Sequence, residues 1–216
     1  MGSYSETGFL ESFKGALWIG FSYFSYPLTF FRQRTWGATK AEISLGLPGD
    51  NLSQNLASQA TRSITLKGSP EENFGWIRQI GCDRGGFYSY SDLENLSGAK
   101  IRNAIKIRPE WQNLSQGDQV LLHPCGEALE VESVIENQTI VLSYQRELLF
   151  GQGIWFTWSF NLFESRENTR LVIRSRGGPL KTSSFANLVW CLIFDPGHFA
   201  MERKMILGLQ VRSEKR

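Results

Sequence analysis

Five segments with the alternating apolar and polar pattern of β-strands follow one another between residues 119 and 176, and short turn-rich pieces join them. The segments span residues 119–124, 128–135, 139–145, 154–163 and 169–176. Strands that follow one another through short turns pair as hairpins. This run therefore predicts an antiparallel meander, and it restricts the fold more than any other feature of the chain.

The alternation gives each predicted strand a dry face and a wet face. In residues 154–163 the dry face carries Phe156, Trp158, Phe160 and Leu162, and the wet face carries Thr157, Ser159 and Asn161. In residues 169–176 the wet face carries Arg170, Arg174 and Arg176. We expect these arginines to lie on the solvated outer face of the sheet, whereas an inverted register would place Arg174 inside.

Helical segments precede the meander. Residues 61–66 alternate well enough for a first strand. After it, Ser69 is a typical N-cap and Pro70 occupies the first helical position, so a helix should begin there. A second short helix should end at Gly98.

A long helical region also follows the meander. Apolar residues recur with helical spacing from Phe185 to Ile193. Asp195 and Pro196 then predict a break and a new helix start. The closing helix runs through residues 199–211 and is apolar on nearly all sides, so we expect it to lie over the sheet.

Five stretches of the sequence carry a resemblance to a known family. They read "TWGATKAEISLGLPGD", "WIRQIGCDRGGFYSYSDLENLSGAKIRN", "PEWQNLSQGDQVLLHP", "FTWSFNLFE" and "FDPGHFAMERKMILGL". Over roughly residues 35–209 they resemble, in order and spacing, bacterial proteins of the SRPBCC superfamily. That group includes START lipid-binding domains, plant pathogenesis-related ligand binders and polyketide cyclases.

The resemblance implies a fold and a type of site. The fold is the α+β helix-grip fold, in which a curved antiparallel β-sheet wraps around a long C-terminal helix and leaves a cavity between them. The order of the predicted elements is the same. Because the chemistry of the superfamily ranges from ligand carriage to cyclisation, the resemblance names no reaction.

The N-terminus lies outside this resemblance. We predict an aromatic and apolar extension at residues 1–34, a connecting segment at 35–59 and the ligand-binding domain at 60–216. Residues 15–31 contain no charge, and Arg32 and Arg34 follow them. The segment could pack on the domain, make a peripheral membrane contact through its aromatic residues, or span a bilayer, although it is shorter than the ~20 residues that a span normally needs.

Composition and motifs exclude several classes of function. Twenty-three basic and twenty-one acidic residues leave a net charge of +2, too small for a nucleic-acid partner. Three widely spaced cysteines indicate neither a disulfide framework nor a zinc site, and no secretory signal is recognisable. We therefore expect a cytoplasmic protein, which could associate with membranes through residues 15–31. The two histidines lack neighbouring ligands at metal spacing, and no nucleotide motif occurs, so we expect no metal and no cofactor.

The closing helix supplies one set of candidate site residues. His198, Glu202 and Met205 fall on one stripe of a helix, which could face the cavity. A His–Glu pair there could orient a polar ligand group or move a proton. Alternatively, Glu202 pairs with bases in solvent and His198 caps a turn. Trp158 is the candidate for an aromatic cavity wall, because it shares the dry face of its strand.

The polar loop between the two short helices supplies the other set. Gly85 and Gly86 allow a tight turn there. In a helix-grip fold this loop lies at the mouth of the cavity, so the resemblance implies that Arg84, Tyr88, Tyr90 and Glu94 lie there. Arg84 could hold a carboxylate or an enolate of a ligand. The alternative is an internal polar network, in which Asp83 or Glu94 pairs with Arg84 or Arg102 and fixes the helices on the sheet.

Two functions follow from this sequence. The first is the binding or carriage of a hydrophobic or aromatic small molecule, or of a lipid, in an internal cavity. The alternative is an enzyme of the polyketide cyclase or dehydratase type that uses the same cavity. The sequence leaves open whether the protein is an enzyme.

Overall fold

The structure is a computed structural model that describes residues 4–5, 9–52, 56–147, 153–181 and 183–215. Its helices are α1 Phe9–Arg34, α2 Lys40–Ser44, α3 Pro70–Arg78, α4 Ser91–Leu96 and α5 Ser184–Glu214, with 3-10 turns η1 Asp50–Leu52 and η2 Pro109–Trp111. Its strands are β1 Tyr4–Ser5, β2 Ser58–Lys67, β3 Asn103–Ala104, β4 Gln119–Leu121, β5 Ala128–Ile135, β6 Thr139–Glu147, β7 Gly153–Ser165 and β8 Asn168–Pro179.

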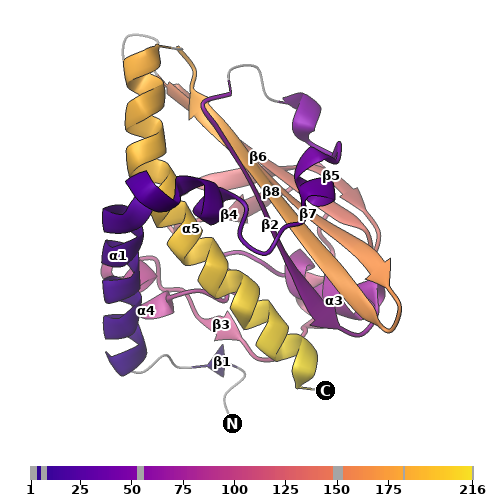
Figure 1. Ribbon diagram of the computed structural model, residues 1–216. Coiled ribbons are helices and arrows are strands. Elements are labelled where there is room, and N and C mark those ends of the chain that lie inside the picture. Colours follow the sequence, from indigo (N-terminus) through magenta and orange to yellow (C-terminus); the bar gives the residue numbers. More distant parts are fainter. Residues whose placement is uncertain (1–3, 6–8, 53–55, 148–152, 182, 216) are drawn as a thin grey trace.

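Six strands form one antiparallel sheet in the order β2-β8-β7-β6-β5-β4. The strands β4 to β8 follow one another as the predicted meander, and β2 closes onto β8. The sheet is curved but open, and the long helix α5 packs against one of its faces (Figure 1). The predicted α+β helix-grip fold is therefore confirmed.

The core lies between the sheet and α5. The dry faces of the strands supply residues such as Phe160 and Ile173, and α5 supplies Met205 and Leu209, all of which are buried. Helix α3 begins where the sequence predicts, because Ser69 and Glu72 form a capping box that satisfies two backbone N–H groups.

Part of the outer face of the sheet, over β7 and β8, is covered, and this corrects the prediction. On β7, Thr157, Ser159 and Asn161 are buried, and Arg174 on β8 is only 3% exposed. The arginine points outward as predicted, but the segment from α2 to η1 covers it. Five acceptors surround its guanidinium group, namely Thr61 Oγ1, the carboxylate of Asp50 and the backbone carbonyls of Glu42, Ile43 and Leu45.

Helix α5 is continuous from Ser184 to Glu214, and the predicted break at Pro196 is wrong. A proline inside a helix frees backbone carbonyls in the preceding turn. Pro196 leaves the Leu192 carbonyl without its helical donor, and the next carbonyl, that of Ile193, accepts a hydrogen bond of 2.6 Å from the Tyr23 hydroxyl of α1. The helix bends instead of ending (Figure 1).

Helix α1 contains the aromatic segment of residues 15–31 and packs along α5 (Figure 1). Its contacts centre on Asp195, which accepts hydrogen bonds from the Tyr26 hydroxyl at 2.7 Å and from Arg34 Nε at 2.9 Å. Among the described residues, no helix is long and apolar enough to cross a bilayer.

Candidate functional site

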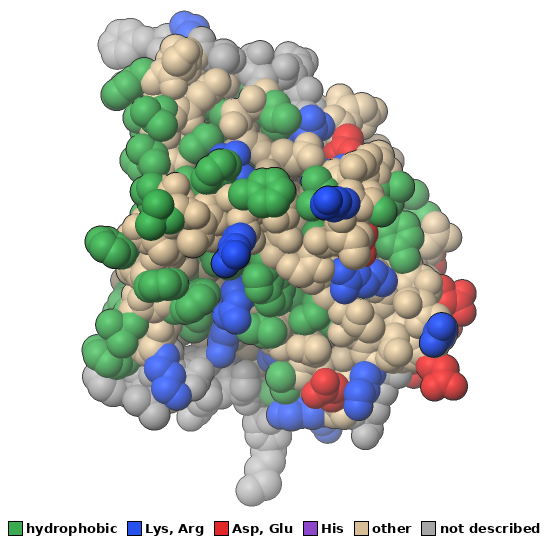
Figure 2. Space-filling view, in the orientation of Figure 1, with side chains coloured by type: hydrophobic (Ala, Val, Ile, Leu, Met, Phe, Trp, Pro, Cys, Tyr) green, Lys and Arg blue, Asp and Glu red, His purple; other side chains and the backbone are tan. Residues whose placement is uncertain are grey.

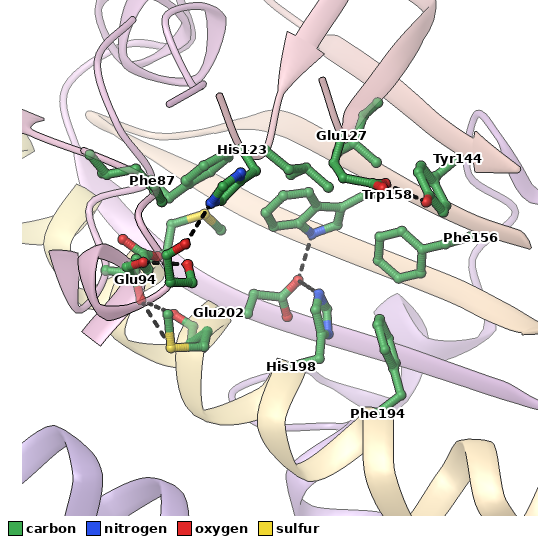
Figure 3. A pocket seen from close by; sticks show the side chains of 18 of the residues that line it. Phe87, Glu94, His123, Glu127, Tyr144, Phe156, Trp158, Phe194, His198 and Glu202 are labelled. Carbon is green, nitrogen blue, oxygen red and sulfur yellow. Dashed lines mark hydrogen bonds and ion pairs between the residues drawn. The ribbon is translucent and has the colours of Figure 1, made fainter. Parts of the chain in front are cut away.

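A cavity of about 480 Å³ lies between α5, the inner face of the sheet and the segment that precedes β4 (Figure 3). Aromatic and aliphatic side chains form most of its wall. They include Phe87, Ile101, Leu129, Ile154, Phe156, Trp158, Trp190, Phe194, Met201 and Met205. Its volume falls within the range of small-molecule sites, which is roughly 300–1,000 Å³.

A buried ion pair forms the polar base of the cavity on the helix side. Glu202 of α5 and Arg62 of β2 pair directly, and each side chain is only 1% exposed. The other carboxylate oxygen of Glu202 accepts a 2.6 Å hydrogen bond from the indole N–H of Trp158. Burial is the largest single effect and raises the pKa of Glu202, but the Arg62 charge, His198 and the hydrogen bonds from Arg62 and Trp158 together outweigh it, and the net shift is downward. Glu202 is therefore ionised, and both of its carboxylate oxygens accept hydrogen bonds.

His198 lies one turn before Glu202 on α5, and Arg62 fixes its tautomer. The Arg62 Nη1 atom lies 3.3 Å from His198 Nδ1. Arginine can only donate hydrogen bonds, so Nδ1 is the acceptor and the proton of the neutral ring sits on Nε2. Burial lowers the pKa of His198 to about 4. The ring is therefore uncharged at neutral pH and offers one N–H donor.

The Nε2 donor of His198 has no hydrogen-bond acceptor among the described residues. The nearest carboxylate oxygen, Glu202 Oε1, lies 3.7 Å away, which exceeds hydrogen-bond distance. A buried unsatisfied donor costs about 1–3 kcal/mol, so an acceptor brought by a ligand would be favourable here.

Aromatic rings extend from His198 along α5. Phe194 stacks on His198 with ring centroids 5.2 Å apart, and Trp190 stacks on Phe194 at 4.3 Å. Phe156 of β7 meets both Phe194 and His198 edge to face. The wall beside the imidazole is therefore flat and aromatic, which suits a planar apolar ligand.

Glu94 of α4 is the second unsatisfied polar group of the cavity wall. Its Oε2 atom is buried and has no hydrogen-bond partner in the described part of the chain. Because burial disfavours the charged form, the pKa of Glu94 is raised to about 7. The carboxyl group changes its charge near neutral pH.

The other polar groups of the wall are paired. His123 contacts the Ser97 carbonyl through Nε2 and the Cys125 N–H through Nδ1, at 3.0 Å and 3.2 Å. Glu127 accepts a 2.6 Å hydrogen bond from the Tyr144 hydroxyl and pairs with Arg146. These groups line the cavity, but their hydrogen bonds are already made within the protein, so they need no partner from a ligand.

The structure brings five of the eight predicted site residues to the cavity, namely Glu94, Trp158, His198, Glu202 and Met205. It corrects two details of the helix stripe. His198 lies within a continuous helix and caps no turn, and Glu202 pairs with a buried base and not with solvent-facing ones.

Arg84, Tyr88 and Tyr90 lie away from the cavity wall. The Arg84 guanidinium donates to the Trp111 carbonyl, and the Tyr88 hydroxyl donates to the Trp76 carbonyl at 2.9 Å. Tyr90 packs between α1 and α5, with the Lys204 ammonium 5.3 Å from its ring centroid. These contacts fix the loop through backbone carbonyls. The described residues show none of the ion pairs of the alternative network, in which Asp83 or Glu94 pairs with Arg84 or Arg102.

Two residues that hold the site and its loop, Arg62 and Asn103, were not predicted from the sequence. Arg62 has the same parity as Ile64 and Leu66 in its strand, so a charge on the inward face was a visible signal. Asn103 accepts the backbone N–H of Tyr88 at 2.7 Å, and Tyr88 has a φ of 55°. Sequence offers no signal for that contact, because it depends on a left-handed residue in a loop.

Comparisons with known proteins give a likeness of fold only. No protein-family model and no curated protein matches the chain. The Mll3558 protein of Rhizobium loti is 15% identical with a TM-score of 0.40, over 70% of this chain and 96% of that one. Protein Ms6760 of Mycobacterium smegmatis is 12% identical with a TM-score of 0.43, over 74% and 93%.

A further solved structure is DynU16, a protein of the dynemicin biosynthetic locus. It is 11% identical with a TM-score of 0.36, over 69% of this chain and 46% of that one. Likenesses of this strength support no conclusion about function.

Proposed function

We propose that this protein binds an uncharged small molecule with an apolar, largely planar body and one oxygen acceptor. The resemblance of its sequence motifs to the SRPBCC superfamily implies a cavity of this kind. The observation that carries the proposal is the pattern of hydrogen bonding in the cavity wall. The wall is apolar, its other polar groups are paired, and His198 Nε2 and Glu94 Oε2 have no partner among the described residues.

The two unsatisfied groups define the polar part of the ligand. His198 is a neutral donor, so it would bind a carbonyl, ether or hydroxyl oxygen. Glu94 would donate to the ligand when protonated and repel an anion when ionised. The apolar body would fill the space beside Phe156, Phe194 and Trp190.

Uptake of an uncharged fluorescent probe such as N-phenyl-1-naphthylamine tests the proposal. Met205→Trp and Met201→Trp, which fill the cavity from α5, should each abolish the rise in fluorescence. Val211→Trp is the matched control, because it introduces the same side chain on the same helix at an exposed position outside the wall. Undiminished uptake by both filled variants, with melting temperatures near that of the wild type, would rule out this cavity as the site.

Glu94 supports a second candidate function, an enzyme of the cyclase or dehydratase type. A carboxyl group whose pKa lies near 7 can accept and return a proton at neutral pH. Native mass spectrometry of protein purified from its own host separates the two functions. A carrier should retain the same molecule in the wild type and in Glu94→Gln. An enzyme should hold molecules of different mass, because the variant would trap the unreacted substrate.

A further inference from the structure

Helix α1 and the first half of α5 expose a continuous set of large apolar side chains, which we call the apolar face. Its members on α1 are Phe13, Leu17, Phe21, Tyr23, Phe24, Leu28, Phe30 and Phe31, and those on α5 are Phe185, Leu188, Val189, Leu192 and Ile193. Phe24 and Leu28 are 88% and 92% exposed. Figure 2 shows apolar side chains gathered along the edge that α1 and α5 form.

The orientation of α1 is the reverse of that of an ordinary surface helix. Its buried face carries polar groups, including Ser22, Gln33 and the Tyr26 hydroxyl that binds Asp195. The Gln33 backbone carbonyl accepts a hydrogen bond of 2.8 Å from Arg62 Nε of β2. These hydrogen bonds fix the rotation of the helix. The apolar stripe must therefore point outward, whereas a water-soluble helix turns such a stripe inward.

The charges around the apolar face suit an anionic surface. From Phe13, where the described side chains of α1 begin, to Arg34, the chain contains three basic residues and no acidic one. From Ser184 to Gly197 the only acid is Asp195, and Arg34 neutralises it. Lys14 and Arg32 are exposed beside the aromatic stripe. A second copy of the chain would oppose like charges here, but anionic lipid headgroups would complement them.

The apolar face also leads to the cavity. A groove of about 780 Å³ on α5 is lined by Tyr23, Phe185, Val189 and Ile193, which belong to the apolar face. The same groove is lined by Ile154, Trp190, Phe194 and His198, which belong to the cavity wall. The residues common to both walls are the aromatic stack of α5 and Ile154 of β7.

We infer that the apolar face docks on the surface of a bilayer that contains anionic lipids, and that the groove admits the ligand from that bilayer. Aromatic side chains would enter the headgroup region while Lys14 and Arg32 contact phosphates. The docking proposal rests only on the exposure and charges of the apolar face. The route through the groove rests on the proposed function.

Flotation of the full chain with phosphatidylcholine vesicles, with and without about 30% phosphatidylserine, tests the docking. The wild type should float with the anionic vesicles. Phe24→Asp/Leu28→Asp should reduce the bound fraction about tenfold or more, because it places charge where the side chains enter the lipid. Both positions are almost fully exposed, so the fold should persist. Ile135→Asp/Phe163→Asp, which adds the same charge at exposed strand ends outside the apolar face, is the control.

Three outcomes would overturn the docking. Equal binding of the wild type to neutral and anionic vesicles would show that the basic residues do not contribute to docking. An equal loss of vesicle binding in both double variants would show that the apolar face is not the docking surface. A dimer in sedimentation velocity that the Phe24→Asp/Leu28→Asp variant abolishes, without vesicle binding by the wild type, would assign the face to self-association.

The route has its own test. Val189→Trp fills the groove but leaves the inner cavity open. It should slow the transfer of N-phenyl-1-naphthylamine from vesicles to the protein at least about fivefold and leave equilibrium uptake from water unchanged. Transfer at the wild-type rate would overturn the route, whereas failed uptake from water by the wild type would overturn the proposed function.

Discussion

Arg62 and Glu202 form an ion pair in which each side chain is only 1% exposed, and the pair joins β2 to α5 at the base of the cavity. Taking two charges out of water is costly, so such a pair contributes little net stability. Removing one partner is different, because it leaves the other charge buried and uncompensated. The pair therefore fixes the position of His198 and Trp158 more than it stabilises the fold.

Loss of one member of this pair should be costly. We expect Arg62→Met and Glu202→Gln each to lower the free energy of unfolding by about 3–5 kcal/mol, measured by urea denaturation. The double variant should cost clearly less than the sum of the two. The exposed pair Arg108 and Glu110 is the control, where single substitutions should cost less than about 1 kcal/mol. Additive losses at the buried pair would contradict the argument.

His198 should discriminate ligands by their oxygen. In the wild type, 2-acetylnaphthalene should bind more tightly than 2-ethylnaphthalene, because only the ketone accepts a hydrogen bond from Nε2. His198→Phe should remove about a fivefold preference, which corresponds to roughly 1 kcal/mol. Isothermal titration calorimetry measures both affinities. Trp190→Phe, which alters the wall without touching the donor, should leave the preference in place.

Glu94 should make ligand binding and stability depend on pH. Its pKa in the folded protein is raised from 4.5 to about 7, so the folded state holds a proton that the unfolded state has lost between these values. Stability from this group is therefore greatest below pH 4.5 and declines as the pH rises to 7. Binding of an uncharged probe should also weaken above pH 7. Both trends should be missing in Glu94→Gln, and a wild-type probe affinity that is constant from pH 6 to 8 would contradict this assignment.

The pKa of His198 shifts in the opposite direction from that of Glu94. The effects of the two groups on stability can therefore be distinguished by their pH dependence. The pKa of His198 falls from 6.5 to about 4 on folding, so the unfolded state binds the proton in that range. The stability that depends on neutral His198 is present above pH 6.5 and is lost as the pH falls toward 4. Relative to the wild type, the melting temperature of Glu94→Gln should therefore rise with increasing pH between 4.5 and 7. That of His198→Phe should rise with decreasing pH between 6.5 and 4.

Local patterns predicted the meander and the order of the elements, because alternation and capping act within a few residues. The segments at 128–135 and 139–145 correspond closely to β5 and β6. The prediction failed where a distant segment supplies the missing partner. Pro196 ends no helix, and α5 packs there on α1, where the Tyr23 hydroxyl donates to the carbonyl of Ile193, 170 residues away in the chain.

The same reason explains the errors at the site. Arg174 was assigned to solvent because no local pattern shows that residues 42–50 fold back over the sheet. His198 and Glu202 were recognised by helical spacing, but their partner Arg62 lies 140 residues from Glu202. The loop with Arg84 was placed at the mouth by analogy of fold, whereas backbone carbonyls such as that of Trp111 decide its position.

Arg174 should be indispensable for the outer layer. Its guanidinium reaches the carbonyls of Glu42, Ile43 and Leu45 together, a geometry that the single ammonium group of lysine cannot reproduce. We expect Arg174→Lys to lower the free energy of unfolding by about 2–4 kcal/mol, because several buried acceptors lose their donor. Arg166→Lys, in the exposed turn between β7 and β8, should change it by less than about 0.5 kcal/mol.

The contacts of Asp195 should determine how firmly α1 is held. Its carboxylate binds the Tyr26 hydroxyl and Arg34, and it is only 6% exposed. Asp195→Ala leaves both partners without their acceptor, and we expect a loss of about 2–4 kcal/mol in the free energy of unfolding. Hydrogen exchange should show the α1 amides losing protection before those of the sheet.

A chain that lacks residues 1–34 completes this test. The truncation removes Tyr26 and Arg34, so the buried carboxylate of Asp195 loses its partners and the Ile193 carbonyl loses Tyr23. The truncated protein should be less stable than the full chain. Asp195→Ala should then change the stability by less than about 0.5 kcal/mol, because the carboxylate has no partner left to lose and α1 no longer covers it. If Asp195→Ala costs as much in the truncated chain as in the full one, the carboxylate acts within α5 alone and does not hold α1.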